Sequence, residues 1–182
     1  GLPEQRITQF QYDRLNRQTK KISETFVSFN PVTQTGVSVT PTETQKYDGR
    51  GNLIESIDAL GNRTLSYYDI LNRKTAQLSA LGQLTVWQFN DGSKPVVQLA
   101  YGTAVALPAS AGGVPPMPAT DGLARQKSFV YDANNRLITT LVPNVTLGTV
   151  APGASNFSIV TTDVVSQSIY DATGNEIHSI DA

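Results

Sequence analysis

Hydrophobic and polar residues alternate in short runs along most of the chain, and turn-forming residues interrupt these runs every 10 or 11 residues. Two positions of the pattern are regularly apolar or β-branched. The first is occupied by Thr19, Ile54, Thr75, Ile138 and Ile177, and the second, three residues later, by Ile22, Ile57, Leu78, Leu141 and Ile180. Such residues suit the pleated, half-buried surface of a sheet, and short strands at this spacing are typical of an all-β protein. The pattern therefore predicts consecutive antiparallel β-hairpins with negligible helix.

A Tyr-Asp pair opens each predicted hairpin, and the third residue after the aspartate is Asn or Gly. The five copies are Tyr12, Asp13 and Asn16; Tyr47, Asp48 and Gly51; Tyr68, Asp69 and Asn72; Tyr131, Asp132 and Asn135; and Tyr170, Asp171 and Gly174. Gly and Asn tolerate a left-handed backbone, and an aspartate three residues before such a residue is typical of a type I turn. We therefore predict that these residues form structural turns, and we interpret the aspartates as turn formers rather than catalytic carboxylates.

The unit occurs almost twice between Lys46 and Leu78, with a period of 21 residues, and Phe89-Asn90 falls at the same step again. A longer period of about 120 residues is superimposed on this one, because the two flanking pairs of Tyr-Asp units are offset by 131 − 12 = 119 and 170 − 47 = 123 residues. Arrays of this kind grow by duplication, and each unit packs against its neighbours. We expect residues 1–182 to be one repeat region and a fragment of a longer array.

Three insertions interrupt the repeats, at residues 26–44, 101–122 and 143–166. The alternation in the first predicts a longer hairpin. The second is apolar but is broken by Gly112-Gly113 and by Pro115, Pro116 and Pro118. It is therefore predicted to be a surface loop and does not fit the roughly 20 uninterrupted apolar residues of a membrane-spanning helix. In the third insertion, Phe157 to Thr161 is predicted to be a strand.

Aromatic residues precede several of the hairpin openings by two positions, namely Phe10, Trp87 and Phe129. Aromatic side chains favour the half-buried face of a sheet, and stacked hairpins would bring these side chains together as cross-strand neighbours. We interpret them as core residues rather than as a platform for a sugar or cofactor.

The single histidine, His178, lies eight residues after its tyrosine. The equivalent positions hold Lys20, Glu55, Ala76 and Thr139. A position that accepts such different residues predicts a solvent-facing strand site, so His178 is not expected to act as a proton carrier.

Composition excludes several classes of function. The formal net charge is −1 and no basic patch occurs, so neither nucleic acid nor an anionic membrane is an expected partner. The chain has no cysteine, which excludes disulfides and thiol chemistry. Clustered zinc ligands, an EF-hand loop and the common nucleotide-binding and hydrolase motifs are absent from the sequence. We therefore expect no cofactor, no metal site and no enzyme activity.

The repeated residues carry a resemblance to a known family. The pattern Tyr-Asp-x-x-(Gly/Asn)-(Arg/Asn), followed by Asp58-x-x-Gly61-Asn62-x-Thr64 and then Tyr68-Asp69, resembles the YD repeat of the RHS family. That family includes bacterial polymorphic toxins, insecticidal toxin complexes and animal teneurins. The resemblance implies a long antiparallel sheet that curves and spirals around a hollow interior, enclosing a toxin payload or forming a rigid extracellular scaffold. The family's self-cleavage segment contains Asp-Pro, and this chain has no Asp-Pro, so no cleavage residue is carried over.

Two functions remain in competition. In the first, the chain is a shell or scaffold segment of a large secreted or cell-surface protein, and its partners are neighbouring repeats, copies of itself or an enclosed toxin payload. In the second, it is an adhesin-like binding module, and the three insertions recognise a glycan or a surface protein.

Overall fold

The computed structural model describes residues 6–119, 124–150 and 157–181. Across these residues the chain forms fourteen antiparallel strands and no helix, so no helix that could cross a membrane is found among them. The prediction of an all-β fold is confirmed. The strands are β1 (Gln9–Tyr12), β2 (Gln18–Ile22), β3 (Phe26–Asn30), β4 (Thr35–Val39), β5 (Thr42–Tyr47), β6 (Leu53–Ile57), β7 (Arg63–Tyr68), β8 (Lys74–Leu78), β9 (Leu84–Phe89), β10 (Pro95–Ala100), β11 (Arg125–Tyr131), β12 (Leu137–Val150), β13 (Phe157–Tyr170) and β14 (Glu176–Ile180).

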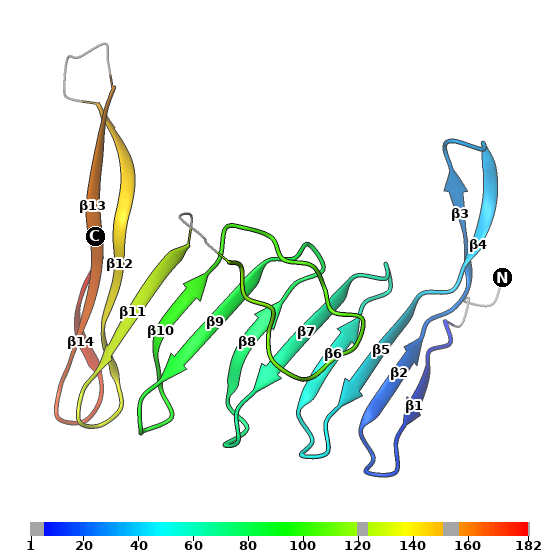
Figure 1. Cartoon of the computed structure of the whole chain (residues 1–182), viewed down its shortest axis with the longest axis horizontal. Helices are drawn as coiled ribbons and strands as arrows, with labels where there is room; N and C mark the ends of the chain where they lie inside the picture. Colours follow the sequence, from blue (N-terminus) through cyan, green and yellow to red (C-terminus); the bar gives the residue numbers. More distant parts are fainter. Residues whose placement is uncertain (1–5, 120–123, 151–156, 182) are drawn as a thin grey trace. The chain divides into compact units, whose positions relative to one another are not determined.

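The strands that Figure 1 labels belong to two compact units. Unit 1 comprises Gly1–Gly82 with Ala106–Pro116, and unit 2 comprises Gln83–Val105 with Met117–Ala182. The sheet order in unit 1 is β1-β2-β5-β6-β7-β8, and β3 and β4 form a separate two-stranded hairpin. The order in unit 2 is β9-β10-β11-β12-β13-β14. Strands thus follow one another in space as they do in the sequence, which is the arrangement that hairpin repeats predict.

Every Tyr-Asp hairpin has the same internal register. Its tyrosine is opposite the residue six positions later, and the residue before the tyrosine is opposite the residue eight positions later, so the seventh is an unpaired bulge. The tyrosine pairs are Tyr12↔Gln18, Tyr47↔Leu53, Tyr68↔Lys74, Tyr131↔Leu137 and Tyr170↔Glu176. At two of the bulges the extra residue is a threonine, and the hydroxyls of Thr19 and Thr75 donate to the carbonyls of Gln11 and Tyr67. The bulge therefore recurs as part of the repeat.

The register between successive hairpins is also constant. The residue eight positions after one opening aromatic residue pairs with the residue three positions before the next. The pairs are Lys20↔Thr44 and Glu55↔Leu65 in unit 1, and Val97↔Ser128 and Thr139↔Gln167 in unit 2. Since a shift of one residue would turn every side chain to the other face, this constancy keeps equivalent positions on equivalent faces throughout each unit.

The three insertions take different forms. Within 26–44, β3 pairs with β4 as an antiparallel hairpin. Residues 101–119 contain no strand, and 120–122 lie outside the described residues. Within 143–166, the chain extends β12 and β13 into a long two-stranded ribbon, and the strand predicted from Phe157 is part of β13.

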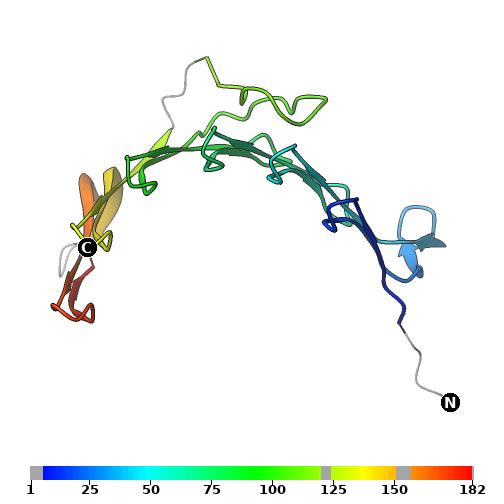
Figure 2. The ribbon, with the colours of Figure 1, turned by 90° about the horizontal axis from the view of Figure 1, so that it is seen from below.

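One face of unit 1 holds its buried core. Leu65, Tyr67, Ala76 and Leu78 are at most 3% exposed, and their alternation and cross-strand pairing place them on one face. Arg63 lies on this face and donates to the carbonyls of Pro108 and Ala109. Residues 106–116 therefore cover this face of the sheet (Figure 2), and their cover is what makes it a core.

The prediction that the aromatic residues preceding the hairpin openings form the core is wrong. Phe10 is 47% exposed, and Trp87 and Phe129 are only half-buried. In unit 1 the position two residues before a tyrosine lies on the face opposite to Leu65 and Tyr67, and the covering segment packs on the other side. The apolar core consists of aliphatic residues and Tyr67 instead.

The prediction of a solvent-facing site eight residues after each tyrosine is also wrong for two of its members. Glu55 is 3% exposed and Ala76 is fully buried, whereas His178 is exposed. This position shares the face of Leu65, so its exposure depends on whether another segment covers that face. Variability in residue type did not indicate exposure here.

The turn between β5 and β6 offers a matched test of backbone conformation. Gly51 has a φ of +93°, in the left-handed region, whereas Gly49 in the same turn does not and has open space around it. We expect Gly51→Ala to lower the free energy of unfolding by about 1–2 kcal/mol, because an L-residue is strained there. Gly49→Ala should be neutral or stabilise the chain by up to about 1 kcal/mol, because it restricts the unfolded chain. Urea unfolding of both variants checks this, and equal effects would contradict the assigned turn.

Candidate functional site: the repeated turn and its contacts between hairpins

The aspartate of each turn is bound within that turn. In the turn opened by Asp48, the amide of Gly51 donates to the Asp48 carbonyl at 3.1 Å, and the Asp48 amide donates to the Asn52 carbonyl at 2.9 Å. The Asp48 Oδ1 accepts the amides of Arg50 and Asn52, and its Oδ2 accepts the Asn52 side-chain amide at 2.9 Å. The same backbone contacts recur at Asp13, Asp58, Asp69, Asp132 and Asp171. The side-chain donor to Oδ2 is an asparagine amide at Asp58 and Asp171 and an arginine Nε at the other three.

The left-handed position of each turn falls three residues after the aspartate. Its φ is 59° to 61° at the asparagines and 93° to 96° at the glycines of the five Tyr-Asp units. The asparagines are Asn16, Asn72 and Asn135, and the glycines are Gly51 and Gly174. In each of the five units, the aspartate and the left-handed residue thus lie in one turn, and the tyrosine is at the end of the preceding strand.

These hydrogen bonds stabilise the ionised aspartates. The side-chain hydrogen bond from Arg17 holds the pKa of Asp13 below its ordinary value of 3.8, and those from Asn175 and Thr173 hold the pKa of Asp171 well below that value. A lowered pKa stabilises the fold above the ordinary pKa, and this contribution is lost as the pH falls through the lowered one. At neutral pH the aspartates are therefore ionised, and their carboxylate oxygens accept hydrogen bonds from within their own turns.

Four of the five tyrosines that open a Tyr-Asp turn join their hairpin to the one before it. The hydroxyl of Tyr47 donates to the Gln18 carbonyl at 3.0 Å, and that of Tyr68 donates to the Leu53 carbonyl at 3.2 Å. In unit 2, Tyr131 and Tyr170 donate to the carbonyls of Pro95 and Leu137 at 3.0 and 3.1 Å. The acceptor is always the residue six positions after the opening aromatic of the preceding hairpin. We call this the tyrosine–carbonyl contact.

The residue after the left-handed position makes a second contact between hairpins. Arg17 donates to the Asp48 carbonyl at 3.3 Å and lies 4.6 Å from the centre of the Tyr47 ring. Arg136 repeats this with the Asp171 carbonyl at 3.0 Å and the Tyr170 ring at 4.8 Å. Such stacking of a guanidinium on an aromatic ring contributes about 0.5–1 kcal/mol at exposed sites.

In the turn opened by Asp48, the residue after the left-handed position is Asn52, which makes a different contact with the next hairpin. Asn52 donates its side-chain amide to Oδ1 of Asn72, the left-handed residue of the next hairpin, at 3.0 Å. Arg17 and Arg136 instead lie beside glycines, Gly51 and Gly174. In these three cases, Arg17 and Arg136 face a glycine of the next hairpin, and Asn52 faces an asparagine. Sequence reasoning missed this pairing, although the identities of the two positions could have indicated it.

A charged cluster lies under the segment that covers unit 1. Glu55 is 3% exposed and bonds Arg63 at 2.9 Å and Lys46 at 3.1 Å. The hydrogen bond from Arg63 is the main cause that holds the pKa of Glu55 below its ordinary value. Arg63 also donates to the carbonyls of Pro108 and Ala109. Arg63 therefore neutralises a buried carboxylate and holds the covering segment.

Tyr67 lies on the same face of the sheet as Leu65, and its environment differs from that of Tyr68. Its side chain is 3% exposed, and its hydroxyl is buried without a hydrogen-bond partner. Burial raises the pKa of this hydroxyl, and the charge of Arg63 opposes the shift. The ring contributes apolar packing, and the hydroxyl makes no compensating hydrogen bond.

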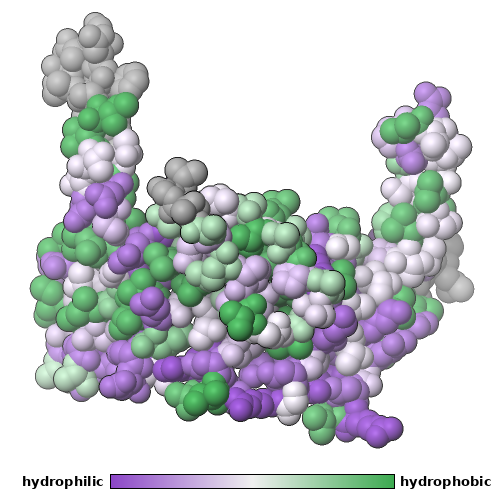
Figure 3. Space-filling view, in the orientation of Figure 1, coloured by the Kyte–Doolittle hydropathy of each residue, from purple (hydrophilic) through white to green (hydrophobic). Residues whose placement is uncertain are grey.

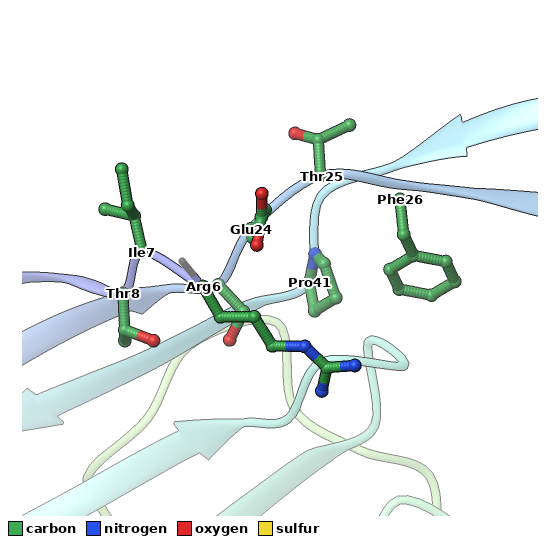
Figure 4. Close-up of a pocket in the computed structure, with 8 residues that line it drawn as sticks. Arg6, Ile7, Thr8, Glu24, Thr25, Phe26 and Pro41 are labelled. Atoms are coloured by element: carbon green, nitrogen blue, oxygen red, sulfur yellow. The ribbon is translucent and has the colours of Figure 1, made fainter. Parts of the chain in front are cut away.

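Among the residues that the structure describes, no group of three or more His, Cys, Asp and Glu side chains could hold a metal ion. A hollow beside the turns at Asp48 and Asp69 is lined by carboxylates that their own turns already use. A second hollow lies at the base of the β3–β4 hairpin, where Arg6 and Phe26 point to one side and Glu24 to the other (Figure 4). Its charged side chains do not converge.

A protein-family model matches the segment in which the repeat is most regular. Residues 47–84 match the family model named RHS Repeat. This segment is similar to an RHS repeat. The matched segment includes the turns at Asp48 and Asp69 and the tyrosine–carbonyl contact between Tyr68 and Leu53. No curated protein matches the chain in sequence.

Solved structures similar to this chain include complexes of TcdB2 and TccC3. The crystal structure of TcdB2-TccC3-Cdc42 is 14% identical, with a TM-score of 0.31, over 93% of this chain and 11% of that one. The structure of TcdB2-TccC3 without the hypervariable C-terminal region is 12% identical, with a TM-score of 0.30, over 94% and 10%. A Tc holotoxin pore from Photorhabdus luminescens is 14% identical, with a TM-score of 0.27, over 94% and 11%. The chain spans about a tenth of each of these proteins.

The Glu55 cluster predicts unequal effects for its two cations. Arg63→Ala leaves Glu55 buried beside a single exposed lysine, and it should lower the free energy of unfolding by about 3–5 kcal/mol. Lys46 is 63% exposed, so Lys46→Ala should cost less than about 1 kcal/mol. Urea unfolding measures both. Similar losses would show that Arg63 is not what neutralises the buried carboxylate.

The neighbouring tyrosines of β7 form a matched pair for the tyrosine–carbonyl contact. Tyr68→Phe removes the donor to Leu53 and should cost about 0.5–1.5 kcal/mol. Tyr67→Phe removes a buried hydroxyl that has no partner, so stability should stay the same or increase. Chemical unfolding of the two variants tests this, and a larger loss for Tyr67→Phe would contradict both assignments.

Proposed function

We propose that this chain is a structural YD-repeat segment of a shell or scaffold in a large secreted or cell-surface protein, without chemistry of its own. The observation that carries the proposal is the tyrosine–carbonyl contact, which recurs with the same register at four junctions. At each of these junctions, a hairpin is bound to its predecessor by a side chain that the repeat itself supplies. Such nearest-neighbour contacts are how repeat proteins build extended, rigid surfaces.

The chemistry of the polar side chains supports the same conclusion. The repeat aspartates are bound within their own turns, and the buried Glu55 is neutralised by Arg63. A catalytic carboxylate needs an environment that brings its pKa toward the working pH, whereas these groups have lowered pKa values. The charged groups therefore support the backbone.

The resemblance to RHS repeats extends the proposal to the parent protein. In that family, the repeats form a spiral sheet around a hollow interior, either as a shell for a toxin or as an extracellular scaffold. We infer the same role for this chain, with neighbouring repeats as its direct partners and an enclosed toxin payload as the partner of the whole shell. Residues 47–84, which match the family model, support this inference.

A second candidate function rests on the β3–β4 hairpin. Val27, Phe29 and Val32 are 71%, 66% and 90% exposed, and the hairpin carries hydrophobic side chains outside the main sheet (Figure 3). Exposed apolar residues that gather together often mark interaction sites. This hairpin, from the first insertion, is the part of the chain that an adhesin-like module would use for a glycan or a surface protein.

Scaffold function predicts that one repeat can be added without loss of the fold. A second copy of residues 47–67, inserted after Tyr67, keeps the 21-residue period and supplies one more turn and tyrosine–carbonyl contact. We expect the unfolding midpoint to stay the same or rise, because each added unit contributes an interface. A scrambled 21-residue insertion is the control and should lower the midpoint. Equal loss with both insertions would contradict the proposal.

The binding alternative is tested on the same chain. Replacing residues 26–39 with an Asn-Gly turn removes the exposed hairpin and leaves the main sheet order intact. On a glycan array and on a panel of surface proteins, we expect neither the chain nor this variant to bind specifically. Specific binding that is lost with the hairpin would favour the adhesin-like module instead.

A further inference from the structure

The covering segment, residues 106–116, belongs to a different unit from the residues on either side of it. It belongs to unit 1, whereas Gln83–Val105 and Met117–Ala182 belong to unit 2. Residues 101–119 contain no strand, so the segment is not part of a sheet ladder. It lies over one face of the sheet of unit 1 (Figure 2) and is bound there by a side chain, that of Arg63. The sheet of unit 1 therefore holds this segment as a binding surface holds a peptide.

The guanidinium that binds the segment is held in place by a buried carboxylate. Nε of Arg63 donates to Oε1 of Glu55 at 2.9 Å, and a terminal nitrogen donates to Oε2 at 3.3 Å. The two terminal nitrogens also donate to the carbonyls of Pro108 and Ala109. Because a guanidinium presents its donors in a fixed fork, Glu55 sets the direction of the donors that face the segment. Arg63 is a preformed donor for two adjacent backbone carbonyls.

The chemistry of the bound segment is uncharged and rich in proline. Residues 101–119 contain no Asp, Glu, Lys or Arg, and one of the two carbonyls that Arg63 binds belongs to a proline. Proline-rich segments have no internal hydrogen bonds, so their carbonyls are free to accept from a binding surface. Leu107 and Ala111 are half-buried, and the face beneath is formed by apolar residues of β7 and β8. Small and aliphatic side chains fit this surface.

The same face carries a donor that the segment leaves unused. Tyr67 is 3% exposed, and its buried hydroxyl has no hydrogen-bond partner. It lies four residues after Arg63 on β7, about 13 Å along the strand, a distance that one extended peptide can span. Because an unpaired buried donor is unfavourable, a peptide that places a carbonyl at Tyr67 would use the face more fully than residues 106–116 do.

We propose that this face of unit 1 is a binding site for extended, uncharged peptides rich in proline and alanine, and that residues 106–116 occupy it in cis. Arg63 binds two adjacent carbonyls, Glu55 is the positioning residue for Arg63, and the apolar residues of β7 and β8 receive the side chains. The covering segment then competes with a peptide from another protein. This binding goes beyond the scaffold function, and its failure would leave the repeat-insertion test of that function unaffected.

A labelled peptide tests this competition. The probe is a fluorescein-labelled synthetic peptide with the sequence of residues 105–118, and fluorescence anisotropy follows its binding to the whole chain. Leu107→Ser in the chain removes an apolar contact of the covering segment, and Val114→Ser is the matched control because Val114 is 86% exposed. We expect the Leu107→Ser chain to bind the probe about tenfold more tightly than the control chain, since a weaker cis competitor leaves the site free more often.

Three outcomes of this titration would overturn the proposal. Equal affinities of the two chains would show that the covering segment does not compete with the probe. Absence of binding to both chains would show that the face is not a peptide site. An apparent affinity that falls as the concentration of the chain rises would show that the competitor is the covering segment of a second copy, which contradicts occupation in cis.

Changes in the probe test the same contacts without altering the protein. On the Leu107→Ser chain, a probe that itself carries Leu107→Ser should bind about tenfold more weakly than the original probe, because it loses a partly buried aliphatic side chain. A probe with Val114→Ser should bind as the original does. Equal binding of all three probes would indicate non-specific adsorption and would overturn the proposal.

The role of Arg63 is tested on the Leu107→Ser chain. Arg63→Lys keeps a cation beside Glu55 but replaces the fork of donors with a single ammonium. Arg50→Lys is the control, because Arg50 is exposed and donates to the Ile70 carbonyl in a turn. We expect Arg63→Lys to weaken binding of the original probe about tenfold, the effect of losing a charge-assisted hydrogen bond, and Arg50→Lys to leave it unchanged. Equal affinities of these two variants would contradict the assigned site.

Discussion

The geometry of this protein depends on an aspartate whose two carboxylate oxygens are bound within its own turn. These contacts set the hairpin reversal, the left-handed residue and the bulge that follows. The bulge leaves the tyrosine opposite the residue six positions later, where its ring reaches the preceding hairpin. A local hydrogen-bond pattern thereby sets a long-range one, since the tyrosine–carbonyl contact forms only if both hairpins keep the same register. The contacts between neighbours depend on the contacts within each turn.

The core depends on a different constraint, which is the cover supplied by an insertion. Residues 106–116 include several small apolar residues and two glycines with positive φ, and Arg63 binds two of their carbonyls. Beneath this segment, positions that are exposed elsewhere in the chain become buried, and a glutamate there needs two cations. The repeat provides a regular sheet, and the insertion decides which part of that sheet has a hydrophobic core.

This division explains what could be predicted from the sequence. The strand spacing, the turn positions and the left-handed residues follow from short-range chemistry, so Asp48 and Gly51 could be assigned from their neighbours alone. The burial of Glu55 and the exposure of Phe10 depend on which face a distant segment covers, and no periodicity within the repeat encodes that choice. The pairing of Arg17 with Gly51 and of Asn52 with Asn72 lies between these cases, because both partners are visible in the sequence but their contact requires the register.

The same register explains where the chain tolerates insertions. The link that contains each insertion starts after the residue ten positions past an opening aromatic residue. It rejoins the flanking strand at the residue five positions before the next opening aromatic residue. These flanking residues pair directly as Ile22↔Thr42, Leu99↔Gln126 and Leu141↔Val165, and the short link after Ile57 returns at Arg63 in the same register. Because the flanking strands close each link with the same pairing, its length can vary at a small cost in loop-closure entropy. No such freedom exists at the Tyr-Asp ends, where one extra residue would move the aspartate, the bulge and the tyrosine out of reach of their partners. Length variation is therefore confined to one end of the hairpins, and the tyrosine–carbonyl contacts lie at the other.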